Sequence, residues 1–263
     1  MDALKVMLAV HVYGDVCGET VQSLVAELGC DAPDLRWDVV YPKSDALVSR
    51  LRSEIVTRAI ESGQDVLAWL DHDIAWEPGM LGGLVRRCAE VKGVVAALTP
   101  YRAEWMFGRG FPWLPLPDRT PDGVEPGVDR LVEADKVPGS FVAFWVPALR
   151  RTVESLETSA DPALRVTRCR SAVEGWFWDV CRPVAVPYAD GQPHQHYLSE
   201  DWALVMRLQA CGVKAYMWTL PFIRHIGRKT YGAGDALGIP GPVDAVEDHL
   251  RMLASPQSPF AKR

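Results

Sequence analysis

An apolar run ends in two carboxylates within the stretch Asp65-Val66-Leu67-Ala68-Trp69-Leu70-Asp71-His72-Asp73-Ile74. The run Val66–Leu70 is typical of a buried strand in a parallel sheet, and a turn and a helix over 80–91 follow it. In open α/β sheets, ligands bind beyond the carboxyl ends of strands, where Asp71 and Asp73 stand. Two hard oxygen ligands there suit Mg²⁺ or Mn²⁺ bridging substrate phosphates, although an Asp-x-Asp pair also occurs in solvated turns.

Strands and helices alternate through the first hundred residues. Apolar runs predict strands over 5–12, 35–41, 66–70 and 93–98, and helical periodicity predicts helices over 19–28, 47–59 and 80–91. Ser44 is the expected N-cap of the second helix and Gly63 its C-terminal stop. This alternation predicts an α/β, Rossmann-like fold, a mostly parallel central sheet flanked by helices, with residues 1–99 as the nucleotide-binding half.

A long excursion then interrupts the pattern. Residues 100–138 contain seven prolines and several aromatic residues. A loop of this length is uncommon unless it forms a lid or a binding surface. We therefore expect it to face an acceptor substrate. Further predicted elements are a strand over 140–146, a helix over 148–156, an irregular stretch to residue 198, a helix over 201–210 and a strand over 213–219. We expect a single domain over 1–232, with 100–232 as the acceptor half and 233–263 as a tail with one short helix near 243–253.

Composition indicates an ordinary globular protein. The 263 residues are 48% hydrophobic and 24% charged, which disfavours disorder, and no apolar run approaches the roughly 20 residues of a membrane span. With a start that lacks the features of a signal peptide, we expect a cytoplasmic protein. The six cysteines are scattered without a Cys-x-x-Cys pair, so neither a zinc site nor a disulfide framework is indicated.

A second acidic motif opens the helix predicted over 201–210. Ser199 is a candidate N-cap, and Glu200 and Asp201 lie in the first turn, where the helix dipole alone also favours acids. After this helix and the next strand comes His225, followed closely by Arg228 and Lys229. A lone histidine is more often structural, but imidazole is a good ligand for Mn²⁺, so a residue in this setting is a candidate to meet a metal and a diphosphate.

The order of these motifs resembles that of the GT-A-type glycosyltransferases, particularly little-characterised bacterial and phage members. The resemblance spans about residues 4 to 232 and rests on Asp71-x-Asp73, Gly139-Ser140, Ser199-Glu200-Asp201-x-Ala203, Arg207, Gly212, and His225-x-Gly227-x-x-x-Tyr231 with Gly232. It implies the same fold class and a metal-dependent transfer of sugar from a nucleotide-diphosphate sugar to an acceptor hydroxyl. UDP is favoured as the nucleotide because it is common among metal-dependent relatives.

The resemblance also implies roles for individual residues. Asp73 and His225 would hold Mn²⁺ (or Mg²⁺) on the diphosphate, and Asp71 would bind either the donor's ribose or the metal. Asp201 is the first candidate for the base or acceptor-orienting carboxylate and Glu200 the second; in a retaining enzyme neither needs to act as a base. The other expected donor-binding residues are Arg52, Arg228, Lys229 and Tyr231, with Ser53 standing where the family commonly has Asn.

The acceptor is left open between a saccharide, a small molecule and a hydroxymethylated base in phage DNA. The ten tryptophans suit stacking on sugars or bases but equally suit a core, and the cluster Arg165, Arg168 and Arg170 is either a phosphate contact or a solvated face. The net charge of −6 disfavours a broad nucleic-acid surface.

Two other functions compete with a glycosyltransferase. Asp71-His72-Asp73 after an apolar strand matches the start of a haloacid-dehalogenase-type phosphatase, but Ala75 stands where Thr or Val is usual and the motif follows two βα units. A non-catalytic module that binds nucleotides or sugars is the second alternative, and the intact acidic pair at 200–201 disfavours it.

Overall fold

The computed structural model describes residues 2–12, 15–42, 47–99, 128–171, 175–187, 195–221 and 223–226. The helices are α1 (Gly18–Leu28), α2 (Val48–Glu61), α3 (Met80–Val91), α4 (Val146–Leu156) and α5 (Glu200–Ala210). The strands are β1 (Leu4–His11), β2 (Leu35–Val40), β3 (Val66–Asp71), β4 (Ile74–Ala75), β5 (Val94–Ala97), β6 (Leu131–Glu133), β7 (Phe141–Trp145), β8 (Arg168–Ser171), β9 (Gly175–Trp178), β10 (Val184–Pro187), β11 (Gln195–Leu198), β12 (Ala215–Trp218) and β13 (Arg224–His225).

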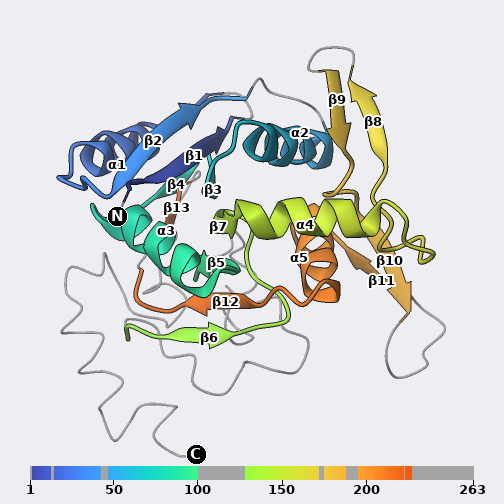
Figure 1. The fold of residues 1–263 in the computed structure, drawn as a ribbon. Coiled ribbons are helices and arrows are strands. Elements are labelled where there is room, and N and C mark those ends of the chain that lie inside the picture. The colour runs from blue at the N-terminus through green and yellow to red at the C-terminus, as the bar shows by residue number, and fades with distance from the viewer. Residues whose placement is uncertain are drawn as a thin grey trace, which may run out of the picture.

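A central sheet of seven strands runs in the order β2-β1-β3-β7-β5-β12-β6 (Figure 1). Strands β2, β1, β3, β5 and β12 share one direction, while β7 lies antiparallel between β3 and β5, and β6 is antiparallel at the edge beside β12. The expected α/β class, with a mostly parallel central sheet flanked by helices, is therefore confirmed. Because β1 and β3 are parallel neighbours, their carboxyl ends meet at one edge.

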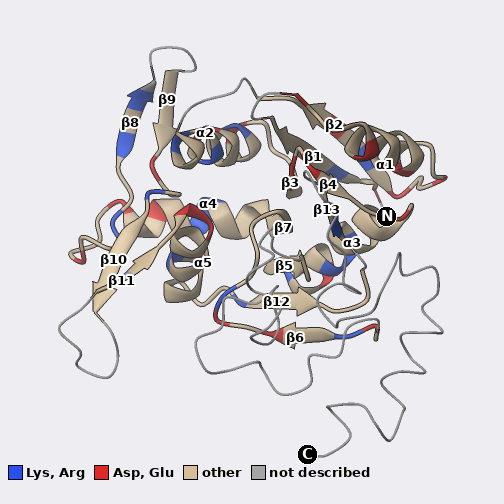
Figure 2. Cartoon of the chain, turned by 180° about the vertical axis from the view of Figure 1, so that it is seen from behind, with Lys and Arg blue, Asp and Glu red and all other residues tan. Residues whose placement is uncertain are grey.

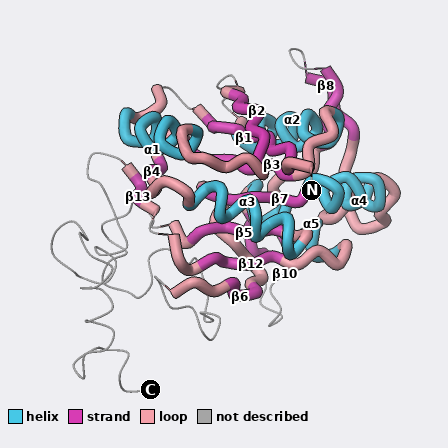
Figure 3. Tube along the Cα trace, turned by 60° about the vertical axis from the view of Figure 1, so that its left-hand side comes forward, coloured by secondary structure: helices cyan, strands magenta, loops and turns pink. Residues whose placement is uncertain are grey.

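Helices cover both faces of this sheet, as the tube in Figure 3 shows. Alternate residues of β1 point to opposite faces, so that Val6, Leu8 and Val10 pack toward α1 and α3 while Met7 and Ala9 pack toward α2, α4 and α5. Strand β3 divides in the same way, and both of its faces are buried. This burial on two sides is why the central strands read as continuous apolar runs.

Some expected elements differ from the structure. The stretch predicted to be irregular up to residue 198 contains two hairpins, β8–β9 and β10–β11, and the predicted excursion contains β6. Each of these strands has only three or four residues, too few to establish a clear period-two pattern. Helix α2 starts at Val48 with Leu47 as its N-cap, while the proposed cap Ser44 lies outside the described residues. Gly63 does follow the end of α2, with a φ of 66°.

Other expectations fall on parts of the chain for which no structure is described. These are most of the proline-rich excursion, residues 100–127, and the tail with its predicted helix, residues 227–263. Within the described ranges, none of the helices combines the length and the apolar character that a membrane crossing requires.

Candidate functional site

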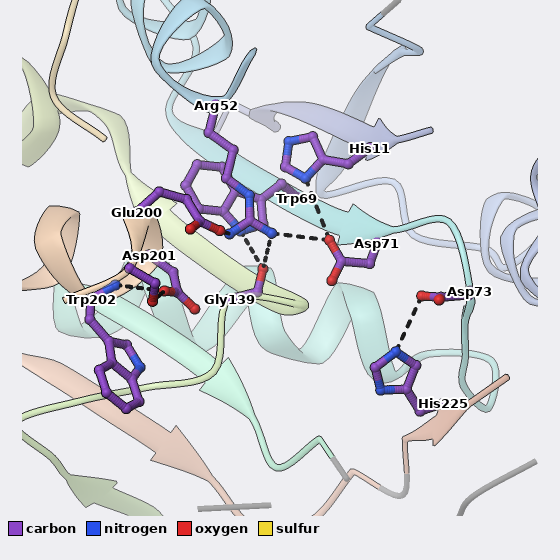
Figure 4. A network of polar contacts seen from close by, with 11 residues as sticks. His11, Arg52, Trp69, Asp71, Asp73, Gly139, Glu200, Asp201, Trp202 and His225 are labelled. Carbon is purple, nitrogen blue, oxygen red and sulfur yellow. Dashed lines mark hydrogen bonds and ion pairs between the residues drawn. The ribbon is translucent and has the colours of Figure 1, made fainter. Parts of the chain in front are cut away.

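Two residues meet at the carboxyl ends of β1 and β3. The parallel register places His11 opposite Asp71, and the two side chains approach to 3.8 Å between Nδ1 and Oδ1 (Figure 4). This distance is too long for a hydrogen bond, and neither ring nitrogen of His11 bonds to any described residue. The backbone N–H of Asp71 donates to the carbonyl of Ser140 (3.0 Å), which ties this strand end to the Gly139-Ser140 segment.

Arg52 joins the two acidic motifs. It lies on α2 with only 4% of its surface exposed, and its Nη2 donates to Asp71 Oδ1 (3.0 Å) while its Nη1 donates to Glu200 Oε1 (2.9 Å). The guanidinium also lies over the indole of Trp69, 5.0 Å from the ring centroid. One buried cation therefore lies between carboxylates that are 129 positions apart in the sequence (200 minus 71).

Burial and neighbouring charges shift the pKa values of His11, Asp71 and Glu200 at this end of the sheet. Burial lowers the pKa of His11 to about 4, so the imidazole is neutral near pH 7. Burial alone would raise the pKa of Asp71, but contact with His11 and the charge of Arg52 outweigh it and lower that pKa to about 2. Burial raises the pKa of Glu200, an effect that Arg52 opposes. At neutral pH the site thus contains an ionised Asp71 paired with a charged Arg52.

Gly139 occupies a position where a side chain does not fit. Its carbonyl accepts hydrogen bonds from Trp69 Nε1 (2.7 Å) and Arg52 Nη2 (3.2 Å). A Cβ at this position would lie 2.6 Å from the Cβ of Asp201 and 2.8 Å from Arg52 Nη1. The close backbone approach therefore requires glycine here.

We expect Gly139→Ala to displace Asp201 and Arg52 and to lower the free energy of unfolding by about 1–3 kcal/mol, because a side chain inserted into a filled site forces its neighbours to shift. The measurement is urea denaturation followed by tryptophan fluorescence. Gly18→Ala is the matched control, since a Cβ at Gly18 meets nothing within 4 Å. Equal losses of stability in the two alanine variants would contradict this role for Gly139.

The carboxylate of Asp73, two positions after Asp71, lies beside the imidazole of His225. Strand β13 pairs antiparallel with β4, which places His225 opposite Ile74, and the N–H of Ile226 donates to the carbonyl of Asp73 (2.7 Å). His225 Nε2 consequently lies 3.4 Å from Asp73 Oδ1, and both side chains are largely buried. The small ladder explains how residues so distant in sequence form a pair.

The second acidic motif starts α5 as expected. Ser199 occupies the N-cap position with an extended backbone, but its hydroxyl donates to Asp201 Oδ1 instead of capping a backbone N–H. The N–H of Trp202 donates to the same oxygen (2.8 Å). Asp201 Oδ2 receives no hydrogen bond from a described residue, so one oxygen of this half-buried carboxylate is held by two donors and the other, which faces Gly139, is not.

Asp73 and His225 are side chains of the types that bind a divalent metal. Asp73 supplies a hard oxygen and His225 a ring nitrogen, a pair that Mn²⁺ accepts. The described residues contain no group of three or more His, Cys, Asp or Glu side chains that could hold a metal. Asp71 is turned toward Arg52 rather than toward this pair. Such a sparse set fits a cation whose remaining ligands are phosphate oxygens and water.

The structure thus brings together most of the candidate site residues named from the sequence. Asp71, Asp73, His225, Glu200, Asp201 and Arg52 all lie around one edge of the sheet (Figure 4). Arg228, Lys229 and Tyr231 lie outside the described residues, so their donor-binding roles stay predictions. The sequence reasoning missed His11, although its position at the end of the first apolar strand, the parallel neighbour of β3, was a usable signal.

Comparisons with known proteins give distant structural similarity only. No protein-family model matches the chain, and no curated protein sequence matches it significantly. Among the solved structures that are similar over most of the chain are two distant ones. One is A197 from STIV, with 14% identity over 87% of this chain and 94% of that chain and a TM-score of 0.47. The other is GalNAc-T7 with UDP, GalNAc and Mn²⁺, with 11% identity over 86% of this chain and 44% of that chain and a TM-score of 0.48. At such values neither similarity identifies the activity of this chain.

Proposed function

We propose that this protein is a metal-dependent glycosyltransferase that transfers a sugar from a nucleotide-diphosphate sugar to an acceptor hydroxyl. The observation that carries the proposal is the arrangement around Arg52. An Asp73–His225 pair suited to a metal lies near Asp71, and a carboxylate with one oxygen not held by a described hydrogen bond lies at Asp201 beyond the guanidinium. Sugar transfer with inversion of configuration uses both features, because one group stabilises the departing diphosphate and another takes up the acceptor's proton.

On the donor side, Asp73 and His225 would hold Mn²⁺ or Mg²⁺. When bound, the metal neutralises the charge that develops on the leaving diphosphate. Arg228 and Lys229 stand three and four positions after His225 in the sequence. We propose that they add positive charge there and that Tyr231 contacts the donor. Arg52 is buried and its guanidinium bonds to two carboxylates, which supports a role in positioning them rather than in direct contact with the donor.

On the acceptor side, the contacts favour Asp201 over Glu200 as the base. Glu200 is committed to an ion pair with Arg52, so uptake of a proton by Glu200 would disrupt that contact. Asp201 is oriented by Ser199 and by the N–H of Trp202, both on Oδ1. These two donors leave Oδ2 to accept the hydroxyl proton of the acceptor.

Substrate identities belong to the proposal as well. UDP is the first nucleotide to test. The acceptor is a saccharide, a small molecule or a hydroxymethylated base in DNA, and the site of action is the cytoplasm, or the host cytoplasm for a phage protein. A saccharide agrees best with the net charge of −6.

The metal role is tested with His225→Ala. We expect a folded protein whose Mn²⁺-dependent affinity for the nucleotide falls at least about tenfold, the order seen when a metal site loses a supporting group. The measurement is calorimetric titration of nucleotide in the presence of Mn²⁺. His72→Ala is the matched control, because the contact of His72 is made by its backbone carbonyl, which accepts from Thr20 and Cys17. Unchanged binding by the His225 variant would reject the ligand role.

A further inference from the structure

The β8–β9 hairpin presents a surface that the site above does not use. It projects from the body of the molecule beside α2 (Figure 1). Basic residues lie along strand β8 (Figure 2). Its antiparallel register pairs Arg168 with Trp178 and Arg170 with Trp176. Since directly opposed residues, and alternate residues of one strand, point to the same side, these four side chains share one face of the hairpin.

On this face each guanidinium lies over an indole. The Arg168 guanidinium is 5.4 Å from the ring centroid of Trp178, and that of Arg170 is 6.0 Å from the ring centroid of Trp176. Guanidinium and indole groups are both planar, so the two cross-strand pairs form a ladder in which each cationic guanidinium lies beside a neutral aromatic ring.

The base of the ladder is fixed to the protein. The backbone N–H of Trp178 donates to the hydroxyl of Thr57 on α2 (3.0 Å), and Phe177 on the opposite face of β9 is buried. Glu157 accepts from both Trp178 Nε1 (2.8 Å) and Arg168 Nε (2.7 Å). The inner Arg–Trp pair is therefore held in place, and the charge of its arginine is compensated.

The outer pair, Arg170 and Trp176, has no such hydrogen bond to a described residue. The Trp176 side chain is 64% exposed, although burial of a large aromatic side chain would be favourable. Arg170 is also exposed, and none of the acidic side chains in the described ranges pairs with it. The outer end of the hairpin thus combines an exposed aromatic side chain with a cation that pairs with no acid among the described residues, and its base is fixed to α2 and Glu157.

We propose that Trp176 and Arg170 bind an acidic saccharide chain. A sugar ring would stack on the indole, and the carboxylate of a uronic acid would accept hydrogen bonds from the guanidinium, which matches carboxylate geometry. The choice of a saccharide rests in part on the proposed function, because the hairpin would then hold an acceptor chain outside the reaction site. A nucleic acid fits less well, since binding a phosphate backbone usually requires several cations and the outer pair has one.

The test is calorimetric titration of the full chain with oligogalacturonate, with a chelator present and without nucleotide. We expect binding that salt weakens, and no comparable binding of a neutral malto-oligosaccharide of equal length or of oligothymidylate. Trp176→Ala and Arg170→Gln should each weaken binding about tenfold, the order expected for losing one stacked ring or one charge-assisted contact. Tyr41→Ala is the control, because Tyr41 is also an exposed aromatic residue, at 56%, on another part of the molecule.

Three results would overturn the proposal: no binding of oligogalacturonate, equal affinity of the hairpin variants and the wild type, or equal or tighter binding of the neutral sugar or of oligothymidylate. The titration contains neither metal nor nucleotide, so its failure leaves the proposed transfer chemistry standing. Conversely, failure of the protein to bind any nucleotide leaves a positive result at the hairpin intact.

Discussion

Asp201→Asn is expected to reduce sugar transfer by about 10²–10⁴-fold while leaving nucleotide binding unchanged. The amide keeps the shape of the carboxylate and can still accept the hydrogen bonds that Ser199 and the N–H of Trp202 donate. It cannot take up the proton of an attacking hydroxyl. The measurements are the initial rate of transfer at saturating donor and, separately, the dissociation constant of the nucleotide with Mn²⁺.

The comparison variant is Ser199→Ala, which removes one donor to Asp201 and leaves the carboxylate in place. We expect a smaller loss of transfer than in Asp201→Asn, because the N–H of Trp202 still orients the side chain. If Asp201→Asn lost nucleotide binding and transfer to the same extent, Asp201 would be structural. If it kept full transfer, the assignment of the base would be wrong.

Replacement of Arg52 by methionine should lower the free energy of unfolding by about 3 kcal/mol, the lower end of the range for breaking a buried ion pair. Methionine fills a similar volume but leaves Asp71 and Glu200 without their common cation, and their side chains are 30% and 18% exposed. The partial exposure of Asp71 is the reason for choosing the lower end. Urea denaturation followed by tryptophan fluorescence measures the change, and Arg52→Lys, which keeps the charge but not the forked geometry, should lose less.

A double-mutant cycle isolates the contact with Glu200. The variants are Arg52→Met, Glu200→Gln and the two combined. We expect an interaction energy of about 1–3 kcal/mol, because residues in direct contact rarely contribute additively. Strict additivity of the two single changes would contradict the view that Arg52 joins the two acidic motifs.

Local patterns in the sequence were sufficient for much of the fold. The apolar run before Asp71 and the helical periodicity after it correctly predicted β3, α3 and their neighbours, because buried parallel strands and amphipathic helices leave strong periodic signals. The hairpins β8–β9 and β10–β11 were missed, since four-residue strands with mixed polarity leave almost no period.

The resemblance of the motif order to the GT-A-type glycosyltransferases grouped Asp73, His225 and Asp201 as candidates, and the structure places them around one edge of the sheet. Their roles stay predictions, and their contacts could not be predicted from the sequence. That Arg52 bonds to Asp71 and Glu200 depends on where α2 and α5 pack against the sheet, which sequence spacing does not encode. The burial of His11 likewise follows from tertiary packing, and with it the lowered pKa.

The decisive experiment for a metal-dependent donor site is calorimetric titration of the wild-type protein with UDP. The titration is made once in the presence of Mn²⁺ and once in the presence of a chelator, and GDP, ADP and CDP serve as comparisons. We expect one nucleoside diphosphate to bind with Mn²⁺ and to lose most of its affinity with the chelator. We also expect Mn²⁺ alone to bind weakly, because the described residues offer the Asp73–His225 pair and no third side-chain ligand beside it. No binding of any nucleotide, or equal binding with and without the chelator, would contradict a metal-dependent donor site at the Asp73–His225 pair.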